Sequence, residues 1–129
     1  MSEEVFPEQT PATNTLSLAS IDTLYPHVAP RTAPPKSAAW AGFSIFRNDC
    51  IACHAINGEG GTIGPDLNVP QSIVEYRPAE QIKAYVRDPG TFRYTSMPSH
   101  PHLSNADLDN LIAYFTVMKT LKHDPGRTP

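Results

Sequence analysis

The chain has few cysteines, no cluster of basic residues and no long apolar run, and each shortage excludes a class of protein. Its 129 residues include two cysteines, too few for a small domain held together by disulfides. Ten basic and thirteen acidic side chains give a net charge of −3, which does not suit a nucleic-acid backbone as partner. The apolar runs fall far short of the ~20 residues of a membrane-spanning helix. We therefore expect one small globular domain, with no membrane span and no nucleic acid partner.

Proline, by contrast, is abundant, and it is concentrated near the start of the chain. Six of the fourteen prolines fall within residues 1–36, where apolar residues follow neither a helical nor a strand period. We interpret residues 1–36 as an extended arm or linker, residues 37–123 as the folded domain and residues 124–129 as a tail. The first residues, Met1 to Glu4, are acidic and no apolar region follows them, so no secretory signal is expected. Either a signal has been removed or the chain is an excised domain.

Three segments carry apolar residues at helical spacing. They cover residues 38–49, Pro78–Asp88 and Ser104–Leu121, and the last begins with a sequence typical of a capping box. The connections between them, residues 55–76 and 90–103, show no strand pair. Loops of that length in a small domain usually wrap around something. The sequence therefore predicts an all-α domain whose long loops enclose a ligand.

The motif with the clearest chemistry is Cys-x-x-Cys-His, formed by Cys50, Cys53 and His54. Two thiols about one helical turn apart can add to the two vinyl groups of a haem, and the adjacent histidine is then placed to bind the iron. Three alternatives use the same residues: a small disulfide loop, a thioredoxin-like redox pair, and a zinc site completed by His100 and His102. The absence of a βαβ pattern and the adjacent cysteine and histidine favour covalent haem c.

A haem that transfers electrons usually has a second axial ligand, and the second long connection contains candidates for it. Met97 lies there, directly before Pro98, which stiffens the loop. Met118 falls on the apolar face of the last helix, where packing is the expected role. His100 and His102 are rival ligands and would lower the potential relative to a thioether, and an open site is the remaining possibility. We predict that Met97 is the distal ligand.

These residues resemble the small monohaem class I c-type cytochromes of bacteria, from about residue 38 to residue 121. The resemblance implies a cytochrome c fold, with three to four helices wrapped around one covalently bound haem c and an extended N-terminal arm outside it. By this likeness the Pro65 carbonyl accepts the N–H of the His54 imidazole, and Gly42 lets the first and last helices cross closely. A glycine merely tolerated within the helix is the alternative for position 42. The matching segments are Gly42 and Phe46 with Leu111 and Tyr114, Asn57–Gly61 with Gly64–Leu67, and Met97–Pro98.

The chain departs from the minimal family pattern in being rich in arginine and aromatic residues on either side of the second helix. We expect Arg77 or Arg93, together with Tyr94, to donate to the haem propionates, because a partly buried carboxylate needs a cation or several donors. A solvated position on the surface is the alternative for each arginine.

The function implied by the resemblance is one-electron transfer, because two protein ligands on the iron leave no position for a substrate. We therefore expect an electron carrier rather than an enzyme, exchanging electrons with a dehydrogenase as donor and an oxidase or another cytochrome as acceptor. Family resemblance also implies a periplasmic location. The main alternative is the electron-exit domain or subunit of a larger periplasmic dehydrogenase; a haem enzyme or gas sensor with a dissociable sixth ligand is another.

Overall fold

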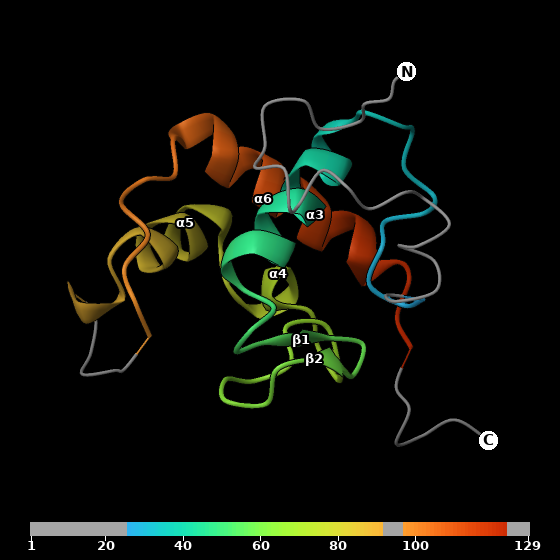
Figure 1. Ribbon diagram of the computed structural model, residues 1–129, viewed down its shortest axis with the longest axis horizontal. Helices are drawn as coiled ribbons and strands as arrows, with labels where there is room; N and C mark the ends of the chain where they lie inside the picture. Colours follow the sequence, from blue (N-terminus) through green and yellow to red (C-terminus); the bar gives the residue numbers. More distant parts are fainter. Residues whose placement is uncertain (1–25, 92–96, 124–129) are drawn as a thin grey trace.

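The computed structural model describes residues 26–91 and 97–123, and Figure 1 shows helices packed around a central crossing. The three predicted helices are present within one or two residues of the expected bounds. The elements in chain order are α3 (Ala38–Asp49), β1 (Ala55–Ile56), β2 (Glu59–Gly60), α4 (Ile73–Tyr76), α5 (Ala79–Arg87), the 3-10 turn η1 (Pro89–Thr91) and α6 (Asn105–Lys119).

Helices α3 and α6 cross at the centre of the domain, and the crossing depends on Gly42. A β-carbon at position 42 would lie 2.7 Å from both the Asn110 backbone carbon and the Tyr114 β-carbon, and closer still to the Asn110 oxygen. The rings of Phe43 and Phe46 lie 5.7 and 5.5 Å from that of Tyr114. Gly42 is therefore required for the close approach of the α3 and α6 backbones, as predicted, and is not simply tolerated in the helix.

Helix α6 begins with the predicted capping box. The hydroxyl of Ser104 accepts a hydrogen bond from the Asp107 backbone N–H at 3.0 Å, and the Asp107 carboxylate accepts one from the Ser104 N–H at 2.9 Å. Two of the N–H groups that a helix start leaves unpaired are thus satisfied. This fixes the point at which the long connection from α5 enters the last helix.

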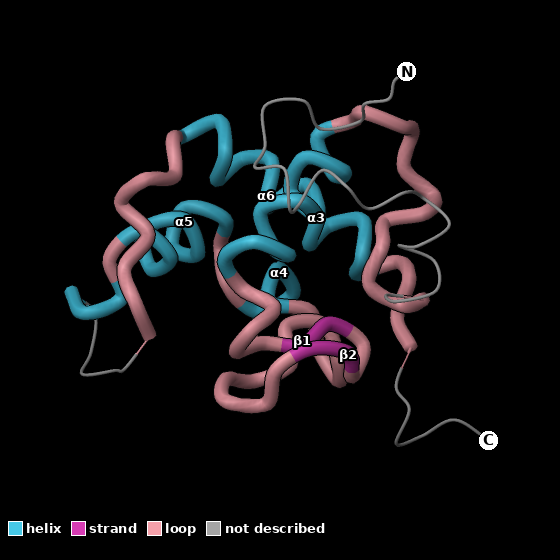
Figure 2. The backbone as a smooth tube through the Cα atoms, in the orientation of Figure 1, coloured by secondary structure: helices cyan, strands magenta, loops and turns pink. Residues whose placement is uncertain are grey.

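A hairpin and a short helix in the first long connection were not predicted. Strands β1 and β2 form an antiparallel hairpin, with Ala55 opposite Gly60, although no strand pair was expected there. The turn between them is Asn57-Gly58, with φ values of 55° and 82°, and this dipeptide favours such tight hairpins. Helix α4 begins with a capping box between Ser72 and Glu75. Elements of two and four residues are too short to show a hydrophobic period, so periodicity alone missed them. Figure 2 shows the hairpin as a small appendage to a helical domain.

The predicted boundary of the N-terminal arm is wrong for its last residues, since part of residues 27–36 packs in the core. Val28 and Ala29 are buried, with 0% and 1% of their surface exposed. The Tyr114 hydroxyl donates to the Val28 carbonyl at 2.8 Å, and the Asn57 side chain donates to the His27 carbonyl at 2.7 Å. Both hydrogen bonds are accepted by backbone carbonyls, which every residue has, so no sequence pattern marks them. Residues 1–25 of the expected arm, and the tail at 124–129, lie outside the described residues.

The core lies mainly between α3 and α6, with α5 and residues 27–30 at its margins (Figure 1). No helix in the described ranges is long and apolar enough to cross a bilayer. The large core side chains that are most deeply buried are Phe43, Phe46, Ile56, Leu108, Leu111, Tyr114 and Met118. Met118 therefore packs in the core, as its position on the apolar face of the helix predicts.

Candidate haem-binding site

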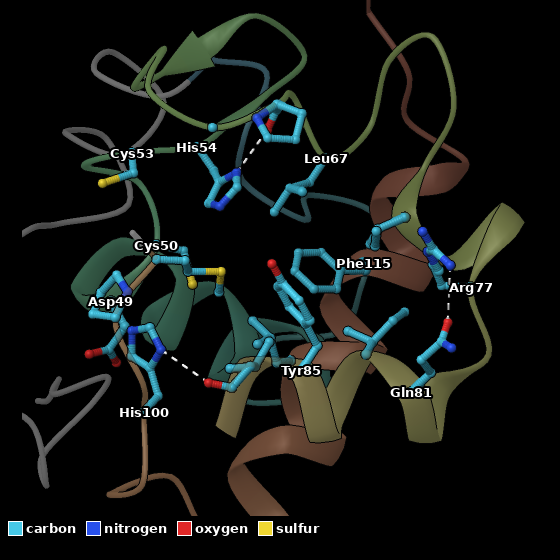
Figure 3. A pocket seen from close by; sticks show the side chains of 18 of the residues that line it. Asp49, Cys50, Cys53, His54, Leu67, Arg77, Gln81, Tyr85, His100 and Phe115 are labelled. Carbon is cyan, nitrogen blue, oxygen red and sulfur yellow. Dashed lines mark hydrogen bonds between the residues drawn. The ribbon is translucent and has the colours of Figure 1, made fainter. Parts of the chain in front are cut away.

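A cavity of about 520 Å³ lies beside the α3–α6 crossing, within the size range of cofactor and ligand pockets. Its wall includes the turn after α3, the loop at residues 63–67, one face of α5, the segment at 97–100 and part of α6 (Figure 3). Much of the lining is apolar, with Leu67, Ile82 and Phe115 among its members. Such a lining suits an apolar macrocycle and excludes water from it.

Both cysteines line this cavity, and a turn that continues from α3 places them there. The Cys50 N–H bonds to the Phe46 carbonyl at 2.9 Å, and the His54 N–H bonds to the Cys50 carbonyl at 2.9 Å. The chain thus keeps winding through the motif after α3 ends. The two cysteines are free thiols, so the disulfide alternative is not present in this structure. Burial, aided by the Asp49 carboxylate, raises the pKa of Cys50 to about 12, which keeps its thiol neutral at physiological pH.

His54 is oriented by the proline that the sequence points to. Its Nδ1 lies 2.8 Å from the Pro65 carbonyl oxygen. Because a carbonyl oxygen can only accept, Nδ1 carries the hydrogen and the Nε2 lone pair is left to bind a metal. Gly64 makes this arrangement possible, since a β-carbon there would lie 2.6 Å from Nδ1 of the ring. The imidazole thus occupies the space that a side chain at position 64 would take.

The loop that carries Pro65 is held in turn by Asp66, a residue that sequence reasoning did not single out. One carboxylate oxygen of Asp66 accepts from the N–H groups of Asn68 and Val69 at 2.8 and 2.9 Å, and the other accepts from the Gly58 N–H at 2.7 Å. The first pair forms a turn of the kind that Asp favours at the start of a loop. The residue type of Asp66 could therefore have predicted the turn to Asn68 and Val69. Its contact with Gly58 joins two loops, so it could not be predicted from the local sequence.

The segment before α6 brings two of the candidate distal ligands to the cavity and leaves the third outside it. Met97 and His100 both line the wall. His100 is 7% exposed, and its Nδ1 lies 3.3 Å from the Val86 carbonyl oxygen. The side chain of His102 is 58% exposed, and its Nε2 lies 3.2 Å from the Asp49 carboxylate. His102 is not among the described residues that line the cavity.

The predicted propionate donors are only partly described. Arg77 lies at the rim of the cavity, with its guanidinium 3.4 Å from the Gln81 side-chain oxygen (Figure 3). Arg93 and Tyr94 lie outside the described residues, so their role stays a prediction. Tyr85, which sequence reasoning did not select, also lines the cavity from α5.

The zinc alternative does not fit this arrangement. Across residues 26–91 and 97–123, no group of three or more histidine, cysteine or acidic side chains is placed to hold a metal ion. The cysteines and the two later histidines are therefore not assembled into a four-ligand zinc site. What the cavity offers instead is two thiols and one oriented imidazole on a largely apolar wall.

Comparison with known proteins identifies the class. The sequence profile of the family named Cytochrome c matches residues 39–119, and the chain belongs to this family. It is 32% identical over 96 residues to a cytochrome c oxidase subunit 2 of Alkalihalophilus pseudofirmus, covering 69% of this chain and 28% of that protein. It is 38% identical over 97 residues to a lupanine 17-hydroxylase [cytochrome c] of a Pseudomonas species, covering 74% of this chain and 13% of that protein.

Membership of the family implies electron transfer through a covalently bound haem c, and the residues present fit that group. The thiols of Cys50 and Cys53 would hold its edge, and the Nε2 of His54 would bind its iron. The bond from His54 to Pro65 and the space left by Gly64 are what a metal-binding imidazole requires. The chain spans about a quarter of one relative and an eighth of the other, so each shared region is a part of a larger protein.

Proposed function

We propose that this protein is a one-electron carrier with one haem c, bound through Cys50 and Cys53 and ligated by His54 and Met97. The observation that carries the proposal is the bond of His54 to Pro65, which directs a metal-binding lone pair into the cavity that Met97 also lines. When bound, the haem supplies an iron that alternates between the ferrous and ferric states. With both His54 and Met97 bound to the iron, no coordination position would remain for a substrate.

The residues around the site support electron transfer without the reaction of a bound substrate. Pro65 holds the His54 ring, and the apolar side chains of Leu67, Ile82 and Phe115 exclude water from the cavity. A dry pocket disfavours the additional positive charge of the ferric state, and a thioether ligand does so too. The expected result is a positive reduction potential and little structural change between the two states.

The proposed ligation is tested by visible spectra of the oxidised and reduced holoprotein. The ferric protein should show the weak far-red band of sulfur-to-iron charge transfer, and Met97→Ala should abolish it. Met118→Leu is the matched control, because that methionine packs in the core and its loss should leave the band in place. A wild-type spectrum without the band, or a band lost in the control alone, would contradict ligation by Met97.

A second candidate is that the chain is the electron-exit part of a larger oxidoreductase. The two relatives favour it, since one is named as an oxidase subunit and the other as a hydroxylase, and this chain matches a part of each. Haem staining after denaturing and after native electrophoresis of protein from the source cells separates the two candidates. A stained polypeptide of about 129 residues that also migrates alone under native conditions supports a free carrier. A much longer stained polypeptide supports a fused module, and a short one that migrates in a large native complex supports a subunit.

We also propose that the protein works outside the cytoplasm, in the periplasm, with a dehydrogenase as electron donor and an oxidase or another cytochrome as acceptor. The support is the covalent haem that its family implies, because haem is attached to paired thiols in that compartment. Fractionation of source cells tests this location: haem-stained protein confined to the cytoplasmic fraction would refute it.

A further inference from the structure

His100 has an environment unlike that of an ordinary surface histidine. It is 7% exposed and lies on the wall of the cavity that His54 and Met97 also line. Figure 3 shows the His54 and His100 rings at the cavity, each joined by a dashed hydrogen bond to the surrounding chain. Its backbone N–H also bonds to the Arg87 carbonyl at 3.2 Å, so the residue is attached to α5 at two points.

The two histidine rings share one hydrogen-bonding arrangement. Nδ1 of His54 faces the Pro65 carbonyl and Nδ1 of His100 faces the Val86 carbonyl, at 2.8 and 3.3 Å. Since a carbonyl can only accept, each neutral ring carries its hydrogen on Nδ1 and its lone pair on Nε2. This is the tautomer in which a backbone carbonyl orients an imidazole for metal binding. The cavity wall therefore holds a second buried imidazole whose neutral ring leaves Nε2 without a hydrogen.

His102 provides the contrast within the same segment. Its side chain is 58% exposed, and its Nε2 is the atom that faces the Asp49 carboxylate, at 3.2 Å. Its Nε2 is thus paired with Asp49, and His102 is not among the described residues that line the cavity. The sequence offered the two histidines as equal rivals, and the structure distinguishes them by burial and by the nitrogen that each presents.

We propose that His100 is a reserve ligand, which binds the haem iron at the sixth position whenever the sulfur of Met97 is not bound. The proposal rests on the proposed function, in which His54 and Met97 are the two axial ligands. Met97 and His100 are three positions apart in the chain, so their α-carbons can be at most about 11 Å apart. A ligand tethered at that range has an effective concentration on the order of millimolar, well suited to replacing its neighbour.

The consequence is a site that stays closed when its thioether is lost. Oxidation of a methionine to the sulfoxide by a peroxide is one such loss. With His100 in reserve, the iron keeps two protein ligands and its potential falls, because imidazole lowers the potential relative to a thioether. Without it, the sixth position is open to water and small external ligands. His100 would thus prevent a damaged carrier from reacting as an open haem.

The test compares three holoproteins in the ferric state: Met97→Ala, Met97→Ala with His100→Ala, and Met97→Ala with His102→Ala. Absorption and electron paramagnetic resonance report the spin state, and titration with imidazole reports access to the iron. We expect Met97→Ala and the His102 control to be low-spin. We expect the His100 double variant to be high-spin and to bind imidazole at least tenfold more tightly than the other two.

Equal imidazole affinity in all three, with Met97→Ala already high-spin, would overturn the reserve role while leaving the wild-type far-red band, and so the proposed function, intact. A wild-type protein without that band would refute ligation by Met97 and the reserve role with it. If the alanine double variant fails to load haem, His100→Phe fills the same volume without a nitrogen. His100→Ala alone should keep the far-red band, and loss of the band there would mean that His100 only positions Met97.

Discussion

Replacing Gly42 by alanine tests whether the contact between α3 and α6 sets the architecture. The added β-carbon would lie 2.7 Å from the Tyr114 β-carbon and the Asn110 backbone carbon, about 0.7 Å short of ordinary contact at 3.4 Å. The obstacles are backbone atoms and a β-carbon, which cannot rotate away. The two helices must therefore separate along the crossing.

The size of the effect follows from two opposed contributions. Overpacking of a core costs about 1–3 kcal/mol, and the rigid neighbours here place the change at or above the top of that range. Alanine in place of glycine returns roughly 0.5–1 kcal/mol through its helix propensity. We expect a net loss of about 2 kcal/mol, which for a domain of this size lowers the melting temperature by about 8–16 °C.

Thermal unfolding of the ferric holoprotein, followed by circular dichroism, measures this change. Gly90→Ala is the matched control, because a β-carbon at position 90 would have the Asp88 carboxylate as its nearest neighbour, at an ordinary 3.8 Å. Gly42→Val should go further and prevent haem loading. A Gly42→Ala protein that melts within 2 °C of the Gly90→Ala protein would refute the argument from close helix approach.

Substitutions at three other positions test contacts of the site and of the core. Gly64→Ala should reduce the haem bound per protein severalfold, by absorbance, because its β-carbon would lie 2.6 Å from His54 Nδ1; normal loading would contradict this. Asp66→Asn should lower urea stability by about 1 kcal/mol, since an amide hydrogen then faces a backbone N–H, and Asp66→Ala should lower it further. Burial raises the pKa of Tyr114 well above 10, so the unfolded state alone loses this proton and stability falls above pH 10. Tyr114→Phe should lower the free energy of unfolding by about 1–2 kcal/mol at pH 7, because the hydrogen bond to Val28 is lost. Above pH 10 the variant should lose less stability than the wild type, by up to ~1.4 kcal/mol per pH unit. The same pH dependence in both proteins would refute this reasoning.

Local patterns in the sequence determined much of the helical framework. The helix at 38–49 and the helix after Ser104 follow from apolar spacing and from a capping box, both of which act within a few residues. The hydrogen bond from His54 to Pro65 was expected from family resemblance, and it is present. The hairpin at Asn57-Gly58 also had a local signal in its dipeptide, but strands of two residues have no period to support it.

Other features depended on contacts between distant residues. Val28 is buried through its own side chain and through a carbonyl that accepts from Tyr114, 86 positions later, so a segment that reads as an arm belongs in part to the core.

The sequence by itself determined the chemistry of the site: Cys50, Cys53 and His54 are adjacent in the chain, and their spacing alone matches covalent haem attachment. The tertiary structure decided which side chains face that chemistry. His100 and His102 are two residues apart and identical in type, yet His100 lies on the cavity wall, whereas His102 is largely exposed and pairs with the Asp49 carboxylate. The physical reason is that burial and hydrogen-bond partners come from α5 and from the end of α3, and no local pattern records which of them each ring will meet.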